Sequence, residues 1–277
     1  MPLMGTMVTL LHQGNWCRSS SKFWWRAPQQ EALTTGTLEL LQLLQYIADM
    51  TNEQLKAGRV KAGLTQMEAA ERLGVSQPYL SQLEKGERPV TQELARVATG
   101  VYRLSATALP IPETAADDAV EPGLLVRQLA ALGYPGFAHL RRRKANPAAV
   151  VLAALLQKDL ETRLAEALPW VLLTYPDLDW AWLISQAKLR DAQNRLGFLV
   201  AVAKVLATSR PEYQPAVAQL TVVEQQLERA RLVREDTLCR DSMPAAERRW
   251  LETNRSPLAR HWNLLTGLAA EQLAYAS

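Results

Sequence analysis

The sequence predicts an all-α protein with two helical domains joined by a linker. Apolar residues recur at helical spacings of three and four through most of residues 52–109 and 123–277, and the alternation typical of strands is nearly absent. Residues 110–122, PIPETAADDAVEP, are acidic, alanine-rich and bounded by prolines, which is typical of a linker. Hydrophobic residues make up 48% of the 277-residue chain, which is enough to form a substantial core.

The first part of the chain predicts little structure. Residues 1–36 mix tryptophans, serines and glutamines without any period, so we expect either a disordered tail or a mis-assigned start. Residues 37–48, TLELLQLLQYIA, have a helical apolar pattern. They are either an extra helix that packs on the following domain or translated upstream sequence that packs nowhere. Met50 is followed by Thr-Asn-Glu, which also suits the opening of a helix.

The stretch from Thr65 to Arg88 predicts two short helices separated by a tight turn. Thr65 and Glu68 have the spacing of a capping box, in which each side chain bonds the backbone N–H of the other residue. Gly74 suits the position just past a helix end, and Ser76 is a good N-cap for the next helix, which we expect over Gln77–Lys85.

Helices are also predicted on both sides of this pair. Asn52 is expected to cap a helix over residues 53–62 that buries Leu55 and ends at Gly63. A further helix is expected from about Gln92 to Tyr102, with its buried side supplied by Leu94, Val97 and Val101. Short turns join all these segments, so a five-helix bundle is the expected shape of a domain over residues 37–109.

Three separated elements in this region resemble the lambda-repressor-like (Cro-repressor, XRE-type) helix-turn-helix family. They are Gly-Leu-Thr-Gln at 63–66, Leu-Gly-Val-Ser at 73–76 and Leu-Glu-Lys-Gly at 83–86. Their order and spacing agree with the family over residues 52–110, about a fifth of the chain. The resemblance implies a DNA-binding domain whose second motif helix lies in the major groove.

The resemblance also implies which side chains contact double-stranded DNA. The amide of Gln66 corresponds to the phosphate-contacting position, and Gln77, Pro78 and Gln82 correspond to positions that contact base edges. A glutamine amide carries both a donor and an acceptor and can bond adenine N6 and N7. Tyr79 and Ser81 flank these positions and are expected to reach phosphates or a thymine methyl group. Lys85 and Arg88, at the end of the helix, are expected to contact phosphates. For Tyr79, partial packing beside Leu80 is an equally good interpretation.

Glu84 is not expected to contact DNA, because phosphates repel a carboxylate. We expect it to pair with Arg59 or Arg72 and to stabilise the domain. The net charge of the chain is only +3, so attraction to DNA would depend on where the cations lie rather than on their excess.

The region 123–277 predicts a larger helical domain. Its first helix carries Leu124, Leu125, Leu129 and Leu132 and ends at Gly133, and Asn146-Pro147 marks the start of an apolar helix over residues 148–160. Residues 178–207 are expected to form two helices that divide near Gly197. A long charged helix is expected over 216–238, with ion pairs Glu228–Arg231 and Arg231–Glu235 and an apolar seam too short for a coiled coil.

The tryptophans of this region are expected to lie in its core. Trp170, Trp180 and Trp182 would pack inside the domain, and Trp250 and Trp262 would belong to a closing helix that packs back on it. The basic run Arg141–Lys144 is interpreted as a solvated surface, with an accessory phosphate-binding patch as the alternative.

No catalytic or metal site is predicted. Asp177 and Asp179 have no histidine or cysteine beside them, and an aspartate before a helix is usually a cap. The three histidines, His12, His139 and His261, have no nucleophile near them in the sequence, and no phosphate-binding glycine loop occurs. We therefore expect neither an enzyme nor a cofactor.

The location is inferred from cysteines and apolar runs. The two cysteines, Cys17 and Cys239, form no disulfide framework, which favours a reducing cytoplasm. No apolar run is long enough to span a membrane, and no basic segment precedes the apolar residues near the start, so a signal peptide is not expected.

These observations favour a sequence-specific transcriptional regulator that binds DNA as a homodimer. The region 123–277 is then a candidate for dimerisation, for sensing a signal or for binding a protein partner. One alternative is an antitoxin that represses its own operon and neutralises a partner enzyme through residues 123–277. An enzymatic role for this region ranks last. The sequence does not indicate the operator, the effector or the oligomeric state.

Overall fold

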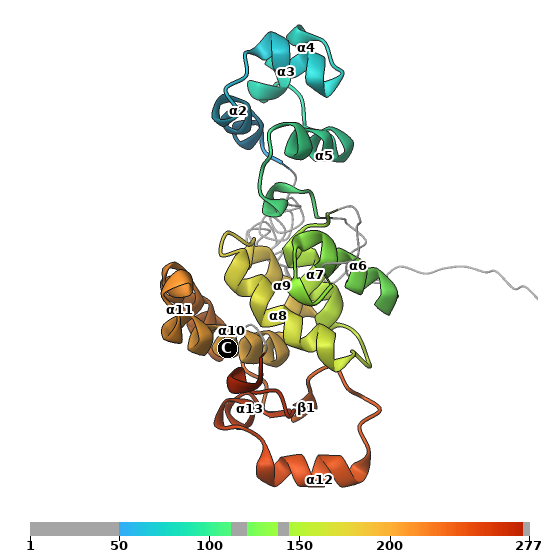
Figure 1. The fold of residues 1–277 in the computed structure, drawn as a ribbon, viewed down its shortest axis with the longest axis vertical. Helices are drawn as coiled ribbons and strands as arrows, with labels where there is room; N and C mark the ends of the chain where they lie inside the picture. Colours follow the sequence, from blue (N-terminus) through green and yellow to red (C-terminus); the bar gives the residue numbers. More distant parts are fainter. Residues whose placement is uncertain (1–49, 112–120, 138–143, 274–277) are drawn as a thin grey trace, which may run out of the picture. The chain divides into compact units, whose positions relative to one another are not determined.

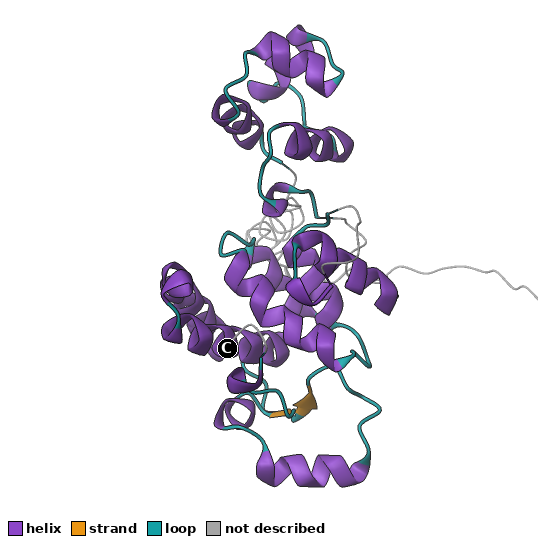
Figure 2. Cartoon of the chain, in the orientation of Figure 1, coloured by secondary structure: helices purple, strands orange, loops and turns teal. Residues whose placement is uncertain are grey.

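The computed structural model confirms the all-α fold class (Figures 1 and 2). It describes residues 50–111, 121–137 and 144–273. The predictions for residues 1–36 and 37–48, for most of the linker and for Arg141–Arg143 lie outside the described residues. None of the helices in the described ranges is both long enough and apolar enough to cross a bilayer.

The N-terminal domain contains five helical segments, which close around a small apolar core. Leu55, Leu80, Leu83 and Ala98 are the fully buried centre of this core, together with Ala69. The segments are α2 (Asn52–Lys61), α3 (Gln66–Leu73), α4 (Gln77–Glu84), α5 (Gln92–Val101) and the 3₁₀ turn η1 (Ala106–Ala108).

Two details of this domain differ from the prediction. The cap of α2 is Thr51 rather than Asn52, because the Thr51 hydroxyl accepts from the Gln54 N–H (3.1 Å) and the Gln54 side chain accepts from the Thr51 N–H (3.0 Å). Val97 was expected to be buried but is 40% exposed. The buried side of α5 runs instead through Leu94, Ala95, Ala98 and Thr99, and Val97 falls on the opposite side.

The segment after α5 takes part in the second core. Ala106, Leu109 and Ile111 are buried within the larger apolar cluster of residues 106–273. The Asn146 side chain donates to the carbonyl oxygens of Thr107 (3.2 Å) and Leu109 (2.6 Å). Ile111 was expected within the linker, but its side chain is 2% exposed.

The larger domain is built from helices that surround the apolar helix α7 and the long helix α10. Every residue of α7 is buried, and α10 packs along both α8 and α11. The α-helices are α6 (Pro122–Leu132), α7 (Pro147–Leu155), α8 (Thr162–Thr174), α9 (Trp180–Leu189), α10 (Gln193–Ser209), α11 (Gln214–Glu228), α12 (Ala245–Asn254) and α13 (Pro257–His261). The short segments are η2 (Pro135–Phe137), η3 (Pro211–Tyr213), η4 (Ala270–Gln272), β1 (Asp236–Thr237) and β2 (Leu264–Leu265), and the two strands are parallel.

Several predicted helix ends of this domain are confirmed. Gly133 follows α6 with a φ of +99°, and Asn146 caps α7 by accepting from the Ala148 N–H (2.9 Å). Asp179 caps α9 by accepting from the Trp182 N–H (2.9 Å), as expected for an aspartate that precedes a helix. These caps depend only on residues within a few positions of the helix end.

Gly197 does not divide two helices, which corrects the prediction. The division lies at residues 190–192, and Gly197 is in the interior of α10. A Cβ atom at this position would lie 2.3 Å from the Trp262 ring, which is fully buried. The glycine is therefore needed for close packing between α10 and the C-terminal segment.

The long charged helix predicted over 216–238 is shorter, since α11 ends at Glu228. The buried amide of Asn194 accepts from the Leu232 N–H (2.8 Å) and donates to the Leu232 carbonyl oxygen (2.8 Å). These bonds take the place of helical bonds at Leu232 and hold this part of the chain outside the helix. The Glu228–Arg231 pair is present at 3.1 Å, but Glu235 pairs with Arg255 (2.8 Å) and not with Arg231.

The tryptophans of this domain divide between core and surface. Trp170, Trp180 and Trp262 are buried and Trp182 packs partly against the same core, as predicted. Trp250 is 60% exposed, which corrects the expectation of a single closing helix. In α12 the buried side chain is that of Leu251, so Trp250 on the adjacent side faces solvent.

Candidate nucleic-acid interface

Local hydrogen bonds form the helix-turn-helix as the sequence predicts. The Thr65 hydroxyl accepts from the Glu68 N–H (3.2 Å), and the Glu68 carboxylate accepts from the Thr65 N–H (2.8 Å). The Thr65 hydroxyl also donates to the Glu68 carboxylate (2.8 Å), and the two bonds that this carboxylate accepts from Thr65 hold the pKa of Glu68 below its usual range. Gly74 takes the left-handed conformation (φ +72°) that ends α3, and the Ser76 hydroxyl caps α4 by accepting from the Tyr79 N–H (3.4 Å).

A buried ion pair lies behind the two helices of the motif. The Glu84 carboxylate accepts two hydrogen bonds from the Arg59 guanidinium, at 2.6 and 3.1 Å. The Glu84 side chain is 3% exposed and the Arg59 side chain 12%. Arg59 also donates to the Leu64 carbonyl oxygen (2.9 Å). Of the two partners predicted for Glu84, Arg59 is confirmed.

The hydrogen bonds continue from this ion pair to the surface of the motif. The Gln66 amide nitrogen donates to Glu84 Oε2 (2.8 Å), and the Gln77 amide nitrogen donates to Gln66 Oε1 (2.9 Å). Gln66 is half-buried and Gln77 is exposed. One chain of bonds therefore joins α2, α3 and both ends of α4.

The chemistry of the side chains decides which group donates and which accepts in each of these hydrogen bonds. An ionised carboxylate only accepts hydrogen bonds, so Gln66 must turn its NH₂ group toward Glu84. The oxygen of Gln66 then faces Gln77, which must donate. Gln77 consequently keeps its own oxygen and one N–H free of this chain.

The ionisation of Glu84 is favoured by its partners. Burial raises the pKa of this carboxyl, but the hydrogen bonds from Arg59 and Gln66, with the Arg59 charge, outweigh it and hold the pKa below the ordinary value of 4.5. The bond to Glu84 in turn raises the pKa of the Arg59 guanidinium. The pair therefore stays charged at neutral pH, which preserves the orientation of both glutamine amides.

The eight residues predicted to contact DNA fall into two groups by burial. Gln77, Pro78, Lys85 and Arg88 are exposed, whereas Gln66, Tyr79, Ser81 and Gln82 are half-buried. The other side of α4 buries Leu80, Leu83 and Glu84 in the domain. Direct contacts join two pairs of the eight residues, Gln66 with Gln77 and Tyr79 with Arg88.

Sequence reasoning missed the bond between Gln66 and Glu84. The two residues are 18 positions apart, and no motif links a glutamine at the start of one helix to a glutamate at the end of the next. The only sign of this bond in the sequence is that both residues are polar and lie at the ends of predicted helices. Only the packing of α3 on α4 brings the two side chains together.

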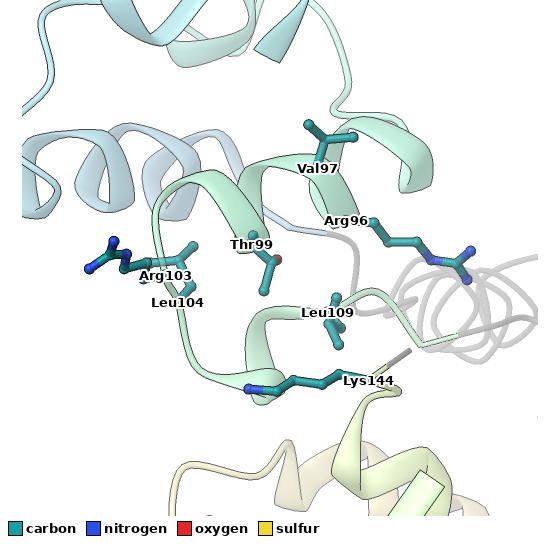
Figure 3. Close-up of a pocket in the computed structure, with 8 residues that line it drawn as sticks. Arg96, Val97, Thr99, Arg103, Leu104, Leu109 and Lys144 are labelled. Carbon is teal, nitrogen blue, oxygen red and sulfur yellow. The ribbon is translucent and has the colours of Figure 1, made fainter. Parts of the chain in front are cut away.

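A hollow of about 490 Å³ beside α5 does not form a second charged site (Figure 3). The Arg96 and Arg103 side chains extend to opposite sides of it, so their charges do not converge on one point. The Thr99 hydroxyl already donates to the Ala95 carbonyl oxygen (2.7 Å). The hollow is lined by Arg96, Val97, Thr99, Gly100, Arg103, Leu104, Leu109 and Lys144.

Asp177 and Asp179 act as local hydrogen-bond acceptors. Asp177 accepts from the Thr107 hydroxyl (2.6 Å), and Asp179 is the cap of α9. Within the described ranges, no group of three histidine, cysteine, aspartate or glutamate side chains is placed to hold a metal ion.

Comparison with known proteins identifies the N-terminal region. A relative named propionyl-CoA carboxylase regulator, from Cereibacter sphaeroides, is 42% identical over 60 residues, which is 22% of this chain and 13% of that protein. The match thus spans a small part of both proteins. No solved structure matches the chain. Residues 55–109 match the family model described as helix-turn-helix, which confirms the resemblance and identifies this part of the chain as a lambda-repressor-like helix-turn-helix domain.

Proposed function

We propose that this protein is a sequence-specific transcriptional regulator that places α4 in the major groove of double-stranded DNA. The observation that carries the proposal is the hydrogen-bonded chain from the buried Glu84 to the exposed Gln77. This chain holds the Gln77 amide at one N–H and leaves its oxygen and its other N–H available for a base edge. This is the donor and acceptor pair that matches N6 and N7 of adenine in the major groove.

The other candidate residues have positioning roles in this proposal. The second N–H of Gln66 is not used by Glu84 and would donate to a phosphate, and Lys85 and Arg88 at the far end of α4 would contact phosphates as well. Such contacts set the register of the protein on the duplex, whereas Gln77 and Gln82 supply discrimination between bases. The family match over residues 55–109 supports this assignment.

The test begins with a duplex that the protein itself chooses. The parent protein is used to select a binding sequence from a random duplex pool, and its affinity for the product is compared with that of the Gln77→Ala, Gln82→Ala double variant. Each bidentate contact contributes about 1–3 kcal/mol, so we expect the affinity to fall by at least about tenfold. The proposal for α4 is wrong if the double variant binds as tightly as the parent.

A matched control is available in the larger domain. Gln225 and Gln226 are exposed glutamines of α11, and replacing both with alanine removes the same groups from a different helix. This control is expected to bind the selected duplex like the parent. An equal loss in the control would mean that the effect does not come from α4.

We also propose that the protein binds as a homodimer. In that case the selected sequences will contain inverted half-sites about one helical turn of DNA apart. The mass of the complex, measured by light scattering, will correspond to two chains per duplex. Residues 123–277 are a candidate for the dimer contact, and selection of isolated half-sites by a single chain would contradict this proposal.

A further inference from the structure

The end of the recognition helix contains a contact between an aromatic ring and a cation. The Arg88 guanidinium carbon lies 5.6 Å from the centre of the Tyr79 ring, within the range of a cation–π interaction. Tyr79 is in the first turn of α4, and Arg88 follows the end of the same helix. The contact therefore joins the first turn of the helix to the segment that follows its end.

Tyr79 and Arg88 differ in burial and in the contacts that restrict their side chains. Tyr79 is half-buried and packs against the apolar core of the domain, which contains Leu80 and Leu83. Arg88 is exposed, and among the residues that the structure describes it forms no ion pair. The ring is thus held in place by packing, whereas the guanidinium has no carboxylate paired with it within the described ranges.

We propose that Tyr79 is a positioning residue, which holds the Arg88 guanidinium in place for a DNA phosphate and does not itself contact the duplex. This inference rests on the proposed function. A long arginine side chain in a turn loses rotamer freedom when it binds, and a ring that restricts it beforehand reduces that loss. A cation–π contact uses the charge of the guanidinium rather than its N–H donors, so these stay available for bidentate contact with phosphate oxygens.

Four variants test the proposal on the duplex selected by the parent protein, with binding measured between 50 and 200 mM salt. Tyr79→Phe keeps the ring and is expected to bind like the parent. Tyr79→Leu removes the ring and is expected to weaken binding about two- to fivefold. Arg88→Ala is expected to lower the slope of log K against log salt by about one, because one phosphate contact is lost.

The decisive measurement is the double variant Tyr79→Leu, Arg88→Ala. If Tyr79 acts through Arg88, the double variant binds as well as Arg88→Ala alone, and Tyr79→Leu shifts the salt slope toward that of Arg88→Ala. A loss caused by damage to the fold would persist in the Arg88→Ala background and multiply. Multiplying effects would therefore overturn the proposal.

Three other outcomes can be told apart. If Tyr79→Phe is as weak as Tyr79→Leu, the hydroxyl contacts DNA directly and the positioning role is wrong. If the parent protein enriches no sequence from the random pool, the proposed function fails and this inference fails with it. Sequence-specific binding that is lost in the Gln77→Ala, Gln82→Ala variant, with no coupling between Tyr79 and Arg88, would leave the proposed function standing and refute the inference alone.

Discussion

Replacing Glu84 with glutamine tests the buried end of the hydrogen-bonded chain. The change keeps the size and one acceptor oxygen of the side chain but removes the charge that balances Arg59. Removing one partner of a buried ion pair costs about 3–5 kcal/mol. Arg59 retains the Leu64 carbonyl oxygen and one side-chain oxygen at residue 84, so we expect the low end, about 3 kcal/mol.

Hydrogen exchange, measured separately for each segment of the intact protein, gives this loss of stability. A fall of about 3 kcal/mol in the free energy of opening corresponds to about a hundredfold faster exchange in α3 and α4. The amides of α7 and α10 in the larger core serve as an internal reference and are expected to exchange at the parent rate. Binding to the selected duplex is also expected to weaken, because the glutamine at 84 can donate and no longer forces the orientation of Gln66.

A second variant separates charge from packing. The double variant Arg59→Met, Glu84→Met removes the whole ion pair and fills a similar volume, and such replacements are often neutral or stabilising. We expect this double variant to regain most of the protection that Glu84→Gln loses, but not the DNA affinity. Parent-like protection in Glu84→Gln, or a double variant as unstable as the single one, would refute the reasoning.

Three further predictions concern acid and glycine. The contribution of Glu84 is complete above about pH 4.5 and is lost as the pH falls through its lowered pKa. In hydrogen exchange, the protection of α3 and α4 in the parent should therefore fall in acid toward that of Glu84→Gln, and an unchanged difference between the two proteins would contradict this. Gly74→Ala places a side chain at φ +72° and should destabilise the domain by about 1–2 kcal/mol. Gly100→Ala lies in open space within α5 and should stabilise the domain by up to about 1 kcal/mol. Thermal unfolding measures both changes, and equal effects of the two variants would contradict both predictions. Gly197→Ala drives a methyl group into Trp262 and should lower stability by about 2–3 kcal/mol in urea unfolding followed by tryptophan fluorescence, and an unchanged midpoint would contradict the packing described.

Much of the helix-turn-helix could be predicted because its signals are local. The capping box of Thr65 and Glu68, the left-handed Gly74 and the Ser76 cap each involve residues within four positions of one another. Local hydrogen bonds of this kind depend on the residue types and their spacing, so they can be inferred without knowing what the helix packs against.

The less accurate predictions have a common cause in distant packing. In the sequence Gly197 suggests a break between two helices. In the structure the helix continues, and the glycine is needed because the Trp262 ring, 65 positions away in the sequence, packs against it. The charged pattern after Glu228 suits a continuing helix, but the buried Asn194 amide takes both backbone groups of Leu232. A single sequence contains no sign of which buried side chain will compete for a backbone bond.

The sequence alone determined the class of the fold, the ends of the motif helices and the identity of the glutamines in the proposed interface. Tertiary structure decided how those glutamines are oriented. The orientation originates at Glu84, which can only accept, and it passes through Gln66 to Gln77 because α3 and α4 pack closely enough for bonds of 2.8 and 2.9 Å. Hydrogen-bond direction across two helices depends on their contact, and that contact exists only once the chain is folded.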